Sequence, residues 1–269
     1  MSSHVRLRID LAYDGAPFAG FARQPDQVTI QGCLEQACER LLGQPVSLVC
    51  AGRTDRGVHA MAQVCHLDVA ADAGRAARAL ADLEVLRGRL DALVGPAITL
   101  WAVRQVSADF DARFSATTRS YRYRLIDADL APPLARYDHW IVGQPLDMPR
   151  MRAGAKRLVG EHDFASFCRK RAGTTTERRL VSATVRRPEP GRIDVRFVGT
   201  AFCHQQVRSM VGCLVEVGRG AREPDWIGQV LTARDRSVAA RVAPPEGLVL
   251  ERVGYGRRWP AAPPPGSVR

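Results

Sequence analysis

Residues 46–69 read VSLVCAGRTDRGVHAMAQVCHLDV and predict two β-strands joined by a polar loop. The strand-like runs are 46–51 and 62–69, and the loop between them is 52–59. The loop holds one carboxylate, Asp55, among two arginines and two glycines. A strand pair of this kind needs further strands and a helix to bury its apolar side chains, so the neighbouring segments define the fold.

The first half of the chain supplies such partners on both sides of this pair. A strand is expected at 5–12, where it ends at the turn residues Asp14 and Gly15. Another strand is expected at 98–106, after a helix rich in alanine, arginine and leucine at 73–92. One apolar helical stripe lies between the first strand and the central pair, formed by Leu34, Ala37, Cys38, Leu41 and Leu42.

The second half repeats the mixture of strands and helices. A helix is expected to start near Asp147, with Pro149 in its first turn. Further strands are expected at 118–126, 180–186, 193–198 and 248–254, and further helices at 204–217 and 224–233. The pattern predicts an α+β protein with mostly antiparallel strands and two domains, 1–107 and 108–258, followed by a proline-rich, disordered tail at 259–269.

Composition narrows the class of protein. The chain has 269 residues, of which 46% are hydrophobic and 25% charged, as in a globular protein with a core. No apolar run approaches the ~18 residues that cross a bilayer, and the first residues do not form a signal peptide, so a cytoplasmic protein without a membrane partner is expected. The net charge of +11 indicates a polyanionic partner, either nucleic acid or an anionic membrane, and of the two a nucleic acid is expected.

The seven cysteines contain no C-x-x-C pair. In an intracellular protein we expect them to be reduced and to act as small apolar residues. Adjacent ligands such as Cys65-His66 or Cys203-His204 give poor geometry for zinc, so no metal site is predicted.

The loop around Asp55 has two interpretations. It could be a tight turn with a solvated carboxylate. Alternatively, the neighbouring Arg53 and Arg56 keep the carboxylate ionised, and the glycines let a ligand approach the backbone. An ionised, positioned Asp55 could then be a nucleophile or a general base.

Three other segments could contribute to a functional site. On a strand at 118–126, alternation places Arg119, Tyr121 and Tyr123 on one face, which suits either stacked bases or a half-buried core strand. In the helix at 204–217, Arg208 needs an anionic partner if it is buried, and Asp55 is a candidate. The segment 167–192 carries eight cations against two glutamates, and its residues Arg169, Lys170 and Arg171 are predicted to contact the RNA backbone.

The residues 51–60, AGRTDRGVHA, resemble the signature loop of the TruA-type tRNA pseudouridine synthases. The resemblance continues in the same order over nearly the whole chain. It includes Tyr13-Asp14-Gly15, Phe110 to Ala116, Arg119-x-Tyr121-Arg122-Tyr123, Phe164-x-Ser166-Phe167, Val207 to Gly212 and Glu246-Gly247-Leu248.

The resemblance implies a role for individual residues. Asp55 matches the catalytic aspartate, and Tyr121 matches the tyrosine that contacts the target base. Arg208 matches the arginine that pairs with the aspartate, Arg53 helps hold the flipped nucleotide, and Leu248 lines the base pocket. The chain departs from the family pattern at Phe21, where Trp is frequent, at Arg56, where Ala is usual, and at Gln205, where a second His is common.

The resemblance also implies a fold and an activity. The fold would be two RRM- or ferredoxin-like halves joined into one extended mixed sheet, with helices on one side and a central basic cleft. The enzyme would be an isomerase that converts uridine to pseudouridine at positions 38, 39 and 40 of the anticodon stem-loop of tRNA. It would need no cofactor and would act as a homodimer.

Two rival functions remain open from the sequence. A non-catalytic RNA-binding protein with RRM-like halves would also use an aromatic and basic strand, but it would not need Asp55. A glycoside or nucleoside hydrolase typically presents two acidic residues, whereas this loop has one.

Overall fold

The computed structural model describes residues 4–71, 74–169, 173 and 175–256. The chain divides into two compact units: unit 1 contains Met1–Thr117 and Leu250–Arg269, and unit 2 contains Thr118–Val249. The predicted tail 259–269, together with Lys170 and Arg171, lies outside the described residues. Both units are mixtures of helices and mostly antiparallel strands, so the predicted α+β class is confirmed.

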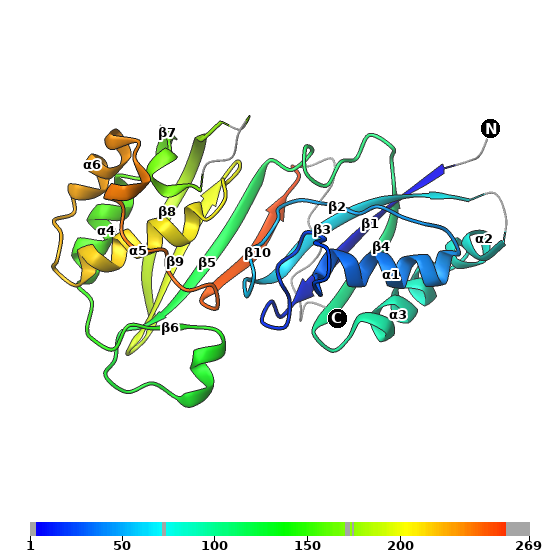
Figure 1. Cartoon of the computed structure of the whole chain (residues 1–269), viewed down its shortest axis with the longest axis horizontal. Coiled ribbons are helices and arrows are strands. Elements are labelled where there is room, and N and C mark those ends of the chain that lie inside the picture. Colours follow the sequence, from blue (N-terminus) through cyan, green and yellow to red (C-terminus); the bar gives the residue numbers. More distant parts are fainter. Residues whose placement is uncertain (1–3, 72–73, 170–172, 174, 257–269) are drawn as a thin grey trace. The chain divides into compact units, whose positions relative to one another are not determined.

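Unit 1 is built on a sheet with the strand order β4-β1-β3-β10, and β2 pairs with β3 (Figure 1). Helices α1 and α3 contact each other, and α3 packs against β4. The elements are β1 His4–Tyr13, α1 Ile30–Leu42, β2 Val49–Cys50, β3 His59–Ala70, α2 Gly74–Leu80, α3 Leu83–Val94, β4 Ile98–Val106 and β10 Leu248–Gly254. The first two residues of β10, Leu248 and Val249, belong to unit 2.

Local sequence explains the ends of α1. Thr29 precedes the helix in extended conformation, and its side chain accepts a hydrogen bond from the Gly32 amide. Gly43 ends the helix with φ 72°, a left-handed conformation that favours glycine. Between these caps, Leu34, Ala37 and Cys38 from the predicted stripe are buried.

The second face of β1 is also covered. Arg8 and Asp10 lie on this strand, are almost fully buried and form an ion pair of 2.7 Å. The Arg8 guanidinium lies over the rings of Phe110 and Tyr255, at 5.5 Å and 5.0 Å from their centroids. A buried charge is tolerated here because it has both a carboxylate partner and aromatic faces.

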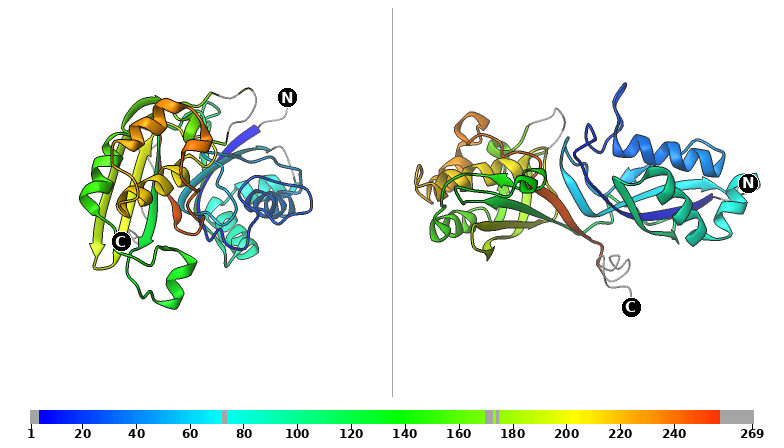
Figure 2. Two further views of the ribbon diagram at one scale, coloured as in Figure 1. Left: turned by 60° about the vertical axis from the view of Figure 1, so that its left-hand side comes forward. Right: turned by 90° about the horizontal axis from the view of Figure 1, so that it is seen from below.

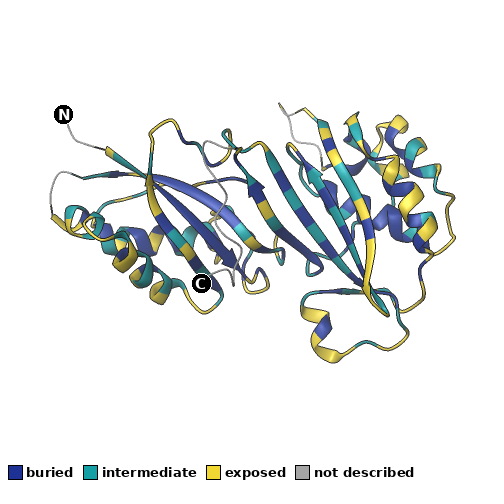
Figure 3. Cartoon of the chain, turned by 180° about the vertical axis from the view of Figure 1, so that it is seen from behind, coloured by how far each residue is buried: buried dark blue, intermediate teal, exposed yellow. Residues whose placement is uncertain are grey.

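Unit 2 has the strand order β5-β9-β8-β7, with the short strand β6 parallel to β5. Along β9, buried residues alternate with partly exposed ones, as the banded strands in Figure 3 show. Helix α4 contacts α5, α6 and β8, and these helices lie on one face of the sheet of this unit (Figure 2). The elements are β5 Thr118–Ile126, β6 Trp140–Ile141, α4 Met148–Lys156, β7 Gly160–Asp163, β8 Glu177–Glu189, β9 Arg192–Gly199, α5 Gln206–Gly218 and α6 Trp226–Ala233, with 3-10 turns at Pro133–Tyr137, Ala165–Phe167 and Arg236–Val238.

Several predicted elements differ in extent from the observed ones, and for three of them the structure shows the local cause. The single helix 73–92 is two helices, because Asp82 caps α3 by accepting hydrogen bonds from the Glu84 and Val85 amides. The strand at 46–51 is only Val49–Cys50, because the Leu48 amide donates to the Glu35 carboxylate instead of to a strand. The helix at 204–217 begins at Gln206, because Gln205 has φ 66°.

Candidate functional site

The Asp55 loop, residues 52–58, connects β2 to β3 in unit 1. The Val58 amide donates to the Asp55 carbonyl at 3.1 Å, which closes a turn, and Gly57 has φ 76° as this turn requires. Thr54 is buried, Asp55 is half-buried, and Arg53 and Arg56 are exposed. The loop therefore presents one carboxylate between two solvent-facing guanidiniums.

A second segment of unit 1, residues 14–21, packs against the Asp55 loop. The Phe21 amide donates to the Thr54 carbonyl at 3.1 Å, and the Gly15 amide donates to His59 Nδ1 at 3.1 Å. A Cβ added to Gly20, whose φ is 113°, would lie 3.1 Å from the Thr54 oxygen. The turn predicted at Asp14 and Gly15 thus supports the backbone on both sides of Asp55.

Strand β5 carries the second predicted site residue, Tyr121, in unit 2. Its ring meets Phe202 edge to face, with 5.1 Å between centroids and an angle of 85°. Tyr121 is 7% exposed, so the ring is fixed by packing rather than free in solution. Phe202 belongs to the loop before α5, and neither spacing nor periodicity marked it as a neighbour of Tyr121.

The predicted common face of Arg119, Tyr121 and Tyr123 is confirmed by the alternating burial along β5. However, this face is in the core and is not an open stacking surface. Tyr123 is fully buried, and its hydroxyl donates to the Pro244 carbonyl at 2.7 Å. Burial raises the pKa of Tyr123 well above its usual range. The Arg119 guanidinium donates to the Thr200 carbonyl at 2.7 Å.

Arg208 lies in the first turn of α5 in unit 2. Its Nε donates to the Ala243 carbonyl at 2.7 Å, and the Ala243 amide donates back to the Arg208 carbonyl at 3.1 Å. The side chain is half-buried and is close enough to Tyr123 to lower the pKa of that hydroxyl slightly against the effect of burial. The guanidinium is therefore held in place by the segment that leads to β10.

Leu248 lies at the start of β10, where its amide donates to the Pro245 carbonyl at 3.0 Å. The side chain is 6% exposed. The preceding residue, Gly247, accepts a hydrogen bond from the Arg124 amide and leaves no room for a Cβ, which would lie 2.7 Å from the Tyr123 ring. Tyr123, Arg208 and Leu248 are thus tied to one region of unit 2.

Asp55 and Arg53 belong to unit 1, whereas Tyr121, Arg208 and Leu248 belong to unit 2. The pairing of Asp55 with Arg208 stays a prediction. Among the described residues, no group of three or more His, Cys, Asp or Glu side chains is arranged to hold a metal ion. No helix in the same part of the chain is long and apolar enough to cross a membrane.

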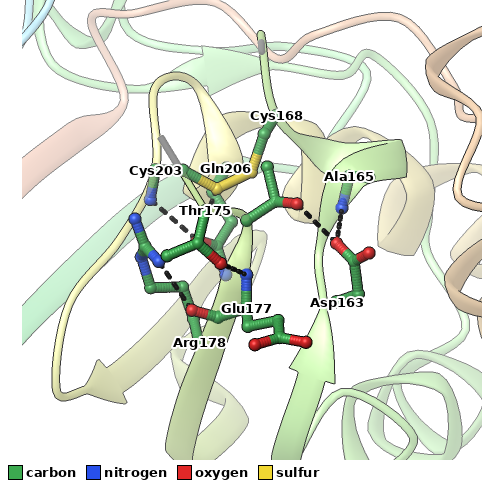
Figure 4. Close-up of a disulfide and its surroundings, with 9 residues drawn as sticks. Asp163, Ala165, Cys168, Thr175, Glu177, Arg178, Cys203 and Gln206 are labelled. Carbon is green, nitrogen blue, oxygen red and sulfur yellow. Dashed lines mark hydrogen bonds between the residues drawn. A yellow bond between two sulfur atoms is a disulfide. The ribbon is translucent and has the colours of Figure 1, made fainter. Parts of the chain in front are cut away.

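The prediction that all seven cysteines are reduced is wrong. Cys168 and Cys203 form a disulfide with their Cα atoms 5.8 Å apart (Figure 4), and the other five cysteines are free. Gln206 lies beside the disulfide, and its Oε1 accepts a hydrogen bond from the Cys203 amide at 2.9 Å. The two cysteines are 35 residues apart in sequence, so their proximity depends on tertiary folding.

We expect the disulfide to stabilise unit 2. Closing a loop of 35 residues is worth up to about 4 kcal/mol of unfolding free energy. A reductant should therefore lower the melting temperature of the parent protein and leave that of a Cys168→Ser/Cys203→Ser variant unchanged. Thiol titration of the denatured, unreduced protein should find five reactive groups. Seven reactive groups would contradict the pairing.

Some cations of the segment 167–192 are paired with carboxylates within unit 2. Arg187 makes two hydrogen bonds to the buried Asp127 carboxylate, at 2.8 Å and 2.6 Å, and these bonds hold the pKa of Asp127 below its usual range. Arg192 pairs with Glu189 at 3.3 Å. Arg169 is exposed, and its amide donates to the His204 carbonyl at 3.0 Å. Of the three cations predicted to contact RNA, the structure describes Arg169.

Comparisons with known proteins identify the family of this chain. A family model described as tRNA pseudouridine synthase matches residues 11–115 and 155–256. Relatives called tRNA pseudouridine synthase A are 46% identical in Frankia casuarinae and 42% identical in Cutibacterium acnes, in both cases over 93% of this chain and 89% of the relative. The relative of that name in Myxococcus xanthus is 38% identical over 98% of this chain and 97% of its own length.

The match includes the Asp55 loop, the Gly15 turn, α5 and β10. The chain belongs to the tRNA pseudouridine synthase family and is a pseudouridine synthase, an isomerase of tRNA uridine.

Proposed function

We propose that this enzyme converts uridine to pseudouridine at positions 38, 39 and 40 in the anticodon stem-loop of tRNA, with Asp55 as the catalytic group. One observation carries the proposal: a single carboxylate is held in a tight turn, between two exposed arginines, within a segment that matches the family. The proposal for the positions rests on the resemblance of the loop and the other motifs to the TruA-type enzymes.

The reaction breaks the C1′–N1 bond, turns the uracil and forms a C1′–C5 bond. The proton on C5 leaves, and N1 ends with a proton, so no electron or other group is exchanged. Asp55 acts as the nucleophile or as the base that removes a sugar proton. The target nucleotide must leave its stack to reach Asp55.

The other predicted residues then have separate tasks. Arg53 is exposed and binds a phosphate of the flipped nucleotide, and Arg208 pairs with the Asp55 carboxylate. Tyr121 orients the freed base, and Leu248 provides an apolar wall that excludes water from the intermediate. Arg169, Lys170 and Arg171 bind the tRNA backbone. The enzyme acts as a cytoplasmic homodimer without a cofactor.

A tRNA labelled with tritium at uridine C5 tests the activity. Pseudouridine formation releases tritium to water, because C5 becomes the atom bonded to the sugar. Free uracil would indicate a nucleoside hydrolase, and neither product would indicate an RNA-binding protein without this activity. Mapping the modified positions in the product tRNA tests the assignment to 38, 39 and 40.

We expect Tyr121→Phe to bind tRNA normally and to slow the chemical step, while Tyr121→Ala loses affinity as well. The ring, which is 7% exposed and packs edge to face on Phe202, supplies the apolar contact with the base, and the hydroxyl contributes to the orientation of the base. Single-turnover rates and tRNA affinities of both variants measure the two effects. Tyr137→Phe and Tyr137→Ala, at an exposed tyrosine of the same unit, are the matched controls. Parent-like rates in both Tyr121 variants would place this residue outside the site.

A further inference from the structure

Three polar side chains are buried beneath the Asp55 loop in unit 1. Tyr13 is 4% exposed, Thr54 is 7% exposed, and Gln63 is completely buried. Tyr13 is the last residue of β1, Gln63 lies in β3, and Thr54 directly precedes Asp55. None of these three side chains has a part in the proposed chemistry.

Hydrogen bonds link the three side chains. Gln63 Nε2 donates to the Gly52 carbonyl at 2.7 Å and to the Tyr13 hydroxyl oxygen at 3.2 Å. The carbonyl of Gly52 can only accept, which fixes the orientation of the Gln63 amide. The Tyr13 hydroxyl and Thr54 Oγ1 share a further hydrogen bond of 2.8 Å, in which either hydroxyl can be the donor. The chain of bonds runs from the sheet to the residue before Asp55.

The backbone of the sheet is adapted to this network. In the ladder between β1 and β3, Leu11 faces Gln63, but Tyr13 faces Ala60. One residue of β1 is therefore opposite two residues of β3, which is a β-bulge. Bulges redirect side chains, and this one lies where Tyr13 and Gln63 approach the loop.

Stability alone does not account for these polar residues. Phe21, which is 1% exposed, lies beside the Tyr13 ring with 6.2 Å between the ring centroids, so this part of the core also contains apolar side chains. Apolar side chains of the same shape could replace the Tyr13 and Thr54 hydroxyls together at little cost to stability, because both partners of that hydrogen bond would be removed, whereas Gln63 also pairs the Gly52 carbonyl. What the network adds is a fixed position for the loop. Its hydrogen bonds to the Gly52 carbonyl and the Thr54 hydroxyl hold the residues on the N-terminal side of Asp55.

We propose that Tyr13 and Gln63 are positioning residues, which hold Asp55 at the target nucleotide without touching the substrate. This inference rests on the proposed function of Asp55. The loop side chains that face solvent, Arg53 and Arg56, are free to contact RNA while the backbone beneath them stays fixed. A shift of about 1 Å at a reacting group can slow a reaction by about two orders of magnitude.

The test separates the chemical step from tRNA binding. We expect Tyr13→Phe and Gln63→Met to reduce the single-turnover rate at saturating tRNA about 10- to 100-fold. The dissociation constant for tRNA should stay within about threefold, because neither side chain reaches the surface. All rates are measured well below the melting temperature of each variant, so unfolding does not contribute.

A double variant tests whether the two residues act together. Because Tyr13 and Gln63 are links of one chain, Tyr13→Phe/Gln63→Met should be no slower than the slower single variant. Independent effects that multiply would overturn the shared role. Hydrogen exchange at amides 52–58 should also increase in each variant, whether or not tRNA is present.

Tyr255→Phe is the matched control. Tyr255 is 3% exposed in the same unit, and its hydroxyl donates to the Ala112 carbonyl at 2.7 Å, away from the loop. This variant should lower the melting temperature as Tyr13→Phe does but keep the parent rate. Parent-like rates for Tyr13→Phe and Gln63→Met, in a protein that makes pseudouridine, would overturn the positioning role. A parent protein that makes no pseudouridine would overturn the proposed function itself.

Discussion

Asp55→Asn is expected to reduce the single-turnover rate of pseudouridine formation at least about 1000-fold. The substitution keeps the size of the side chain and removes the charge, so neither attack on the sugar nor proton removal remains possible. Affinity for tRNA should stay within several-fold, since the exposed Arg53 and Arg56 are unchanged. Rates with saturating tRNA and a separate binding titration measure the two quantities.

Asp26→Asn is the matched control for the loss of one negative charge. Asp26 is exposed in unit 1 and has φ 56°, a conformation that Asn adopts readily. This variant should turn over at the parent rate. If Asp55→Asn keeps even a tenth of the parent rate, Asp55 is not the catalytic carboxylate.

The sequence predicted strand boundaries best where an apolar or alternating run has a clear start and a clear end. The predicted strands 98–106, 118–126 and 248–254 coincide with β4, β5 and β10. Long apolar or alternating runs produce such signals. The strand at 46–51 failed because Glu35, 13 residues before Leu48, takes over one of its backbone bonds. A single sequence does not reveal that competition.

The candidate site also contains residues that the sequence revealed and residues that it did not. Asp55, Arg53 and the glycines of the loop are neighbours in the sequence, so the motif alone singled them out. Gln63 acts on Gly52, 11 residues away, and Phe202 packs on Tyr121 from the loop before α5. Gln63 could have been found by asking why a strand residue is polar among apolar ones. Nothing in the spacing of Phe202 indicated its contact.

Gly15→Ala is expected to have the second-largest effect, although Gly15 is not near the chemistry in sequence. A Cβ at this position would lie 2.1 Å from the Val58 carbonyl oxygen and 2.5 Å from its carbon. Because both atoms are backbone, the loop itself must move, and the Val58 amide is bonded to the Asp55 carbonyl. Overpacking of this kind typically costs 1–3 kcal/mol of stability. The displaced carboxylate should slow the reaction about 100-fold.

Gly88→Ala in α3 separates this effect from a general effect of adding a methyl group. Apart from its chain neighbours and the backbone of α3 itself, no atom lies within 4 Å of a Cβ added to Gly88. The free energy of unfolding of this variant should rise by about 0.5–1 kcal/mol, because alanine is more favourable than glycine inside a helix. Its reaction rate should equal that of the parent. Melting curves and single-turnover rates of both variants distinguish a displaced Asp55 loop from a general effect of the added methyl group. A Gly15→Ala enzyme with the parent rate would mean that the loop relaxes without moving Asp55, and that the support from residues 14–21 is not needed for catalysis.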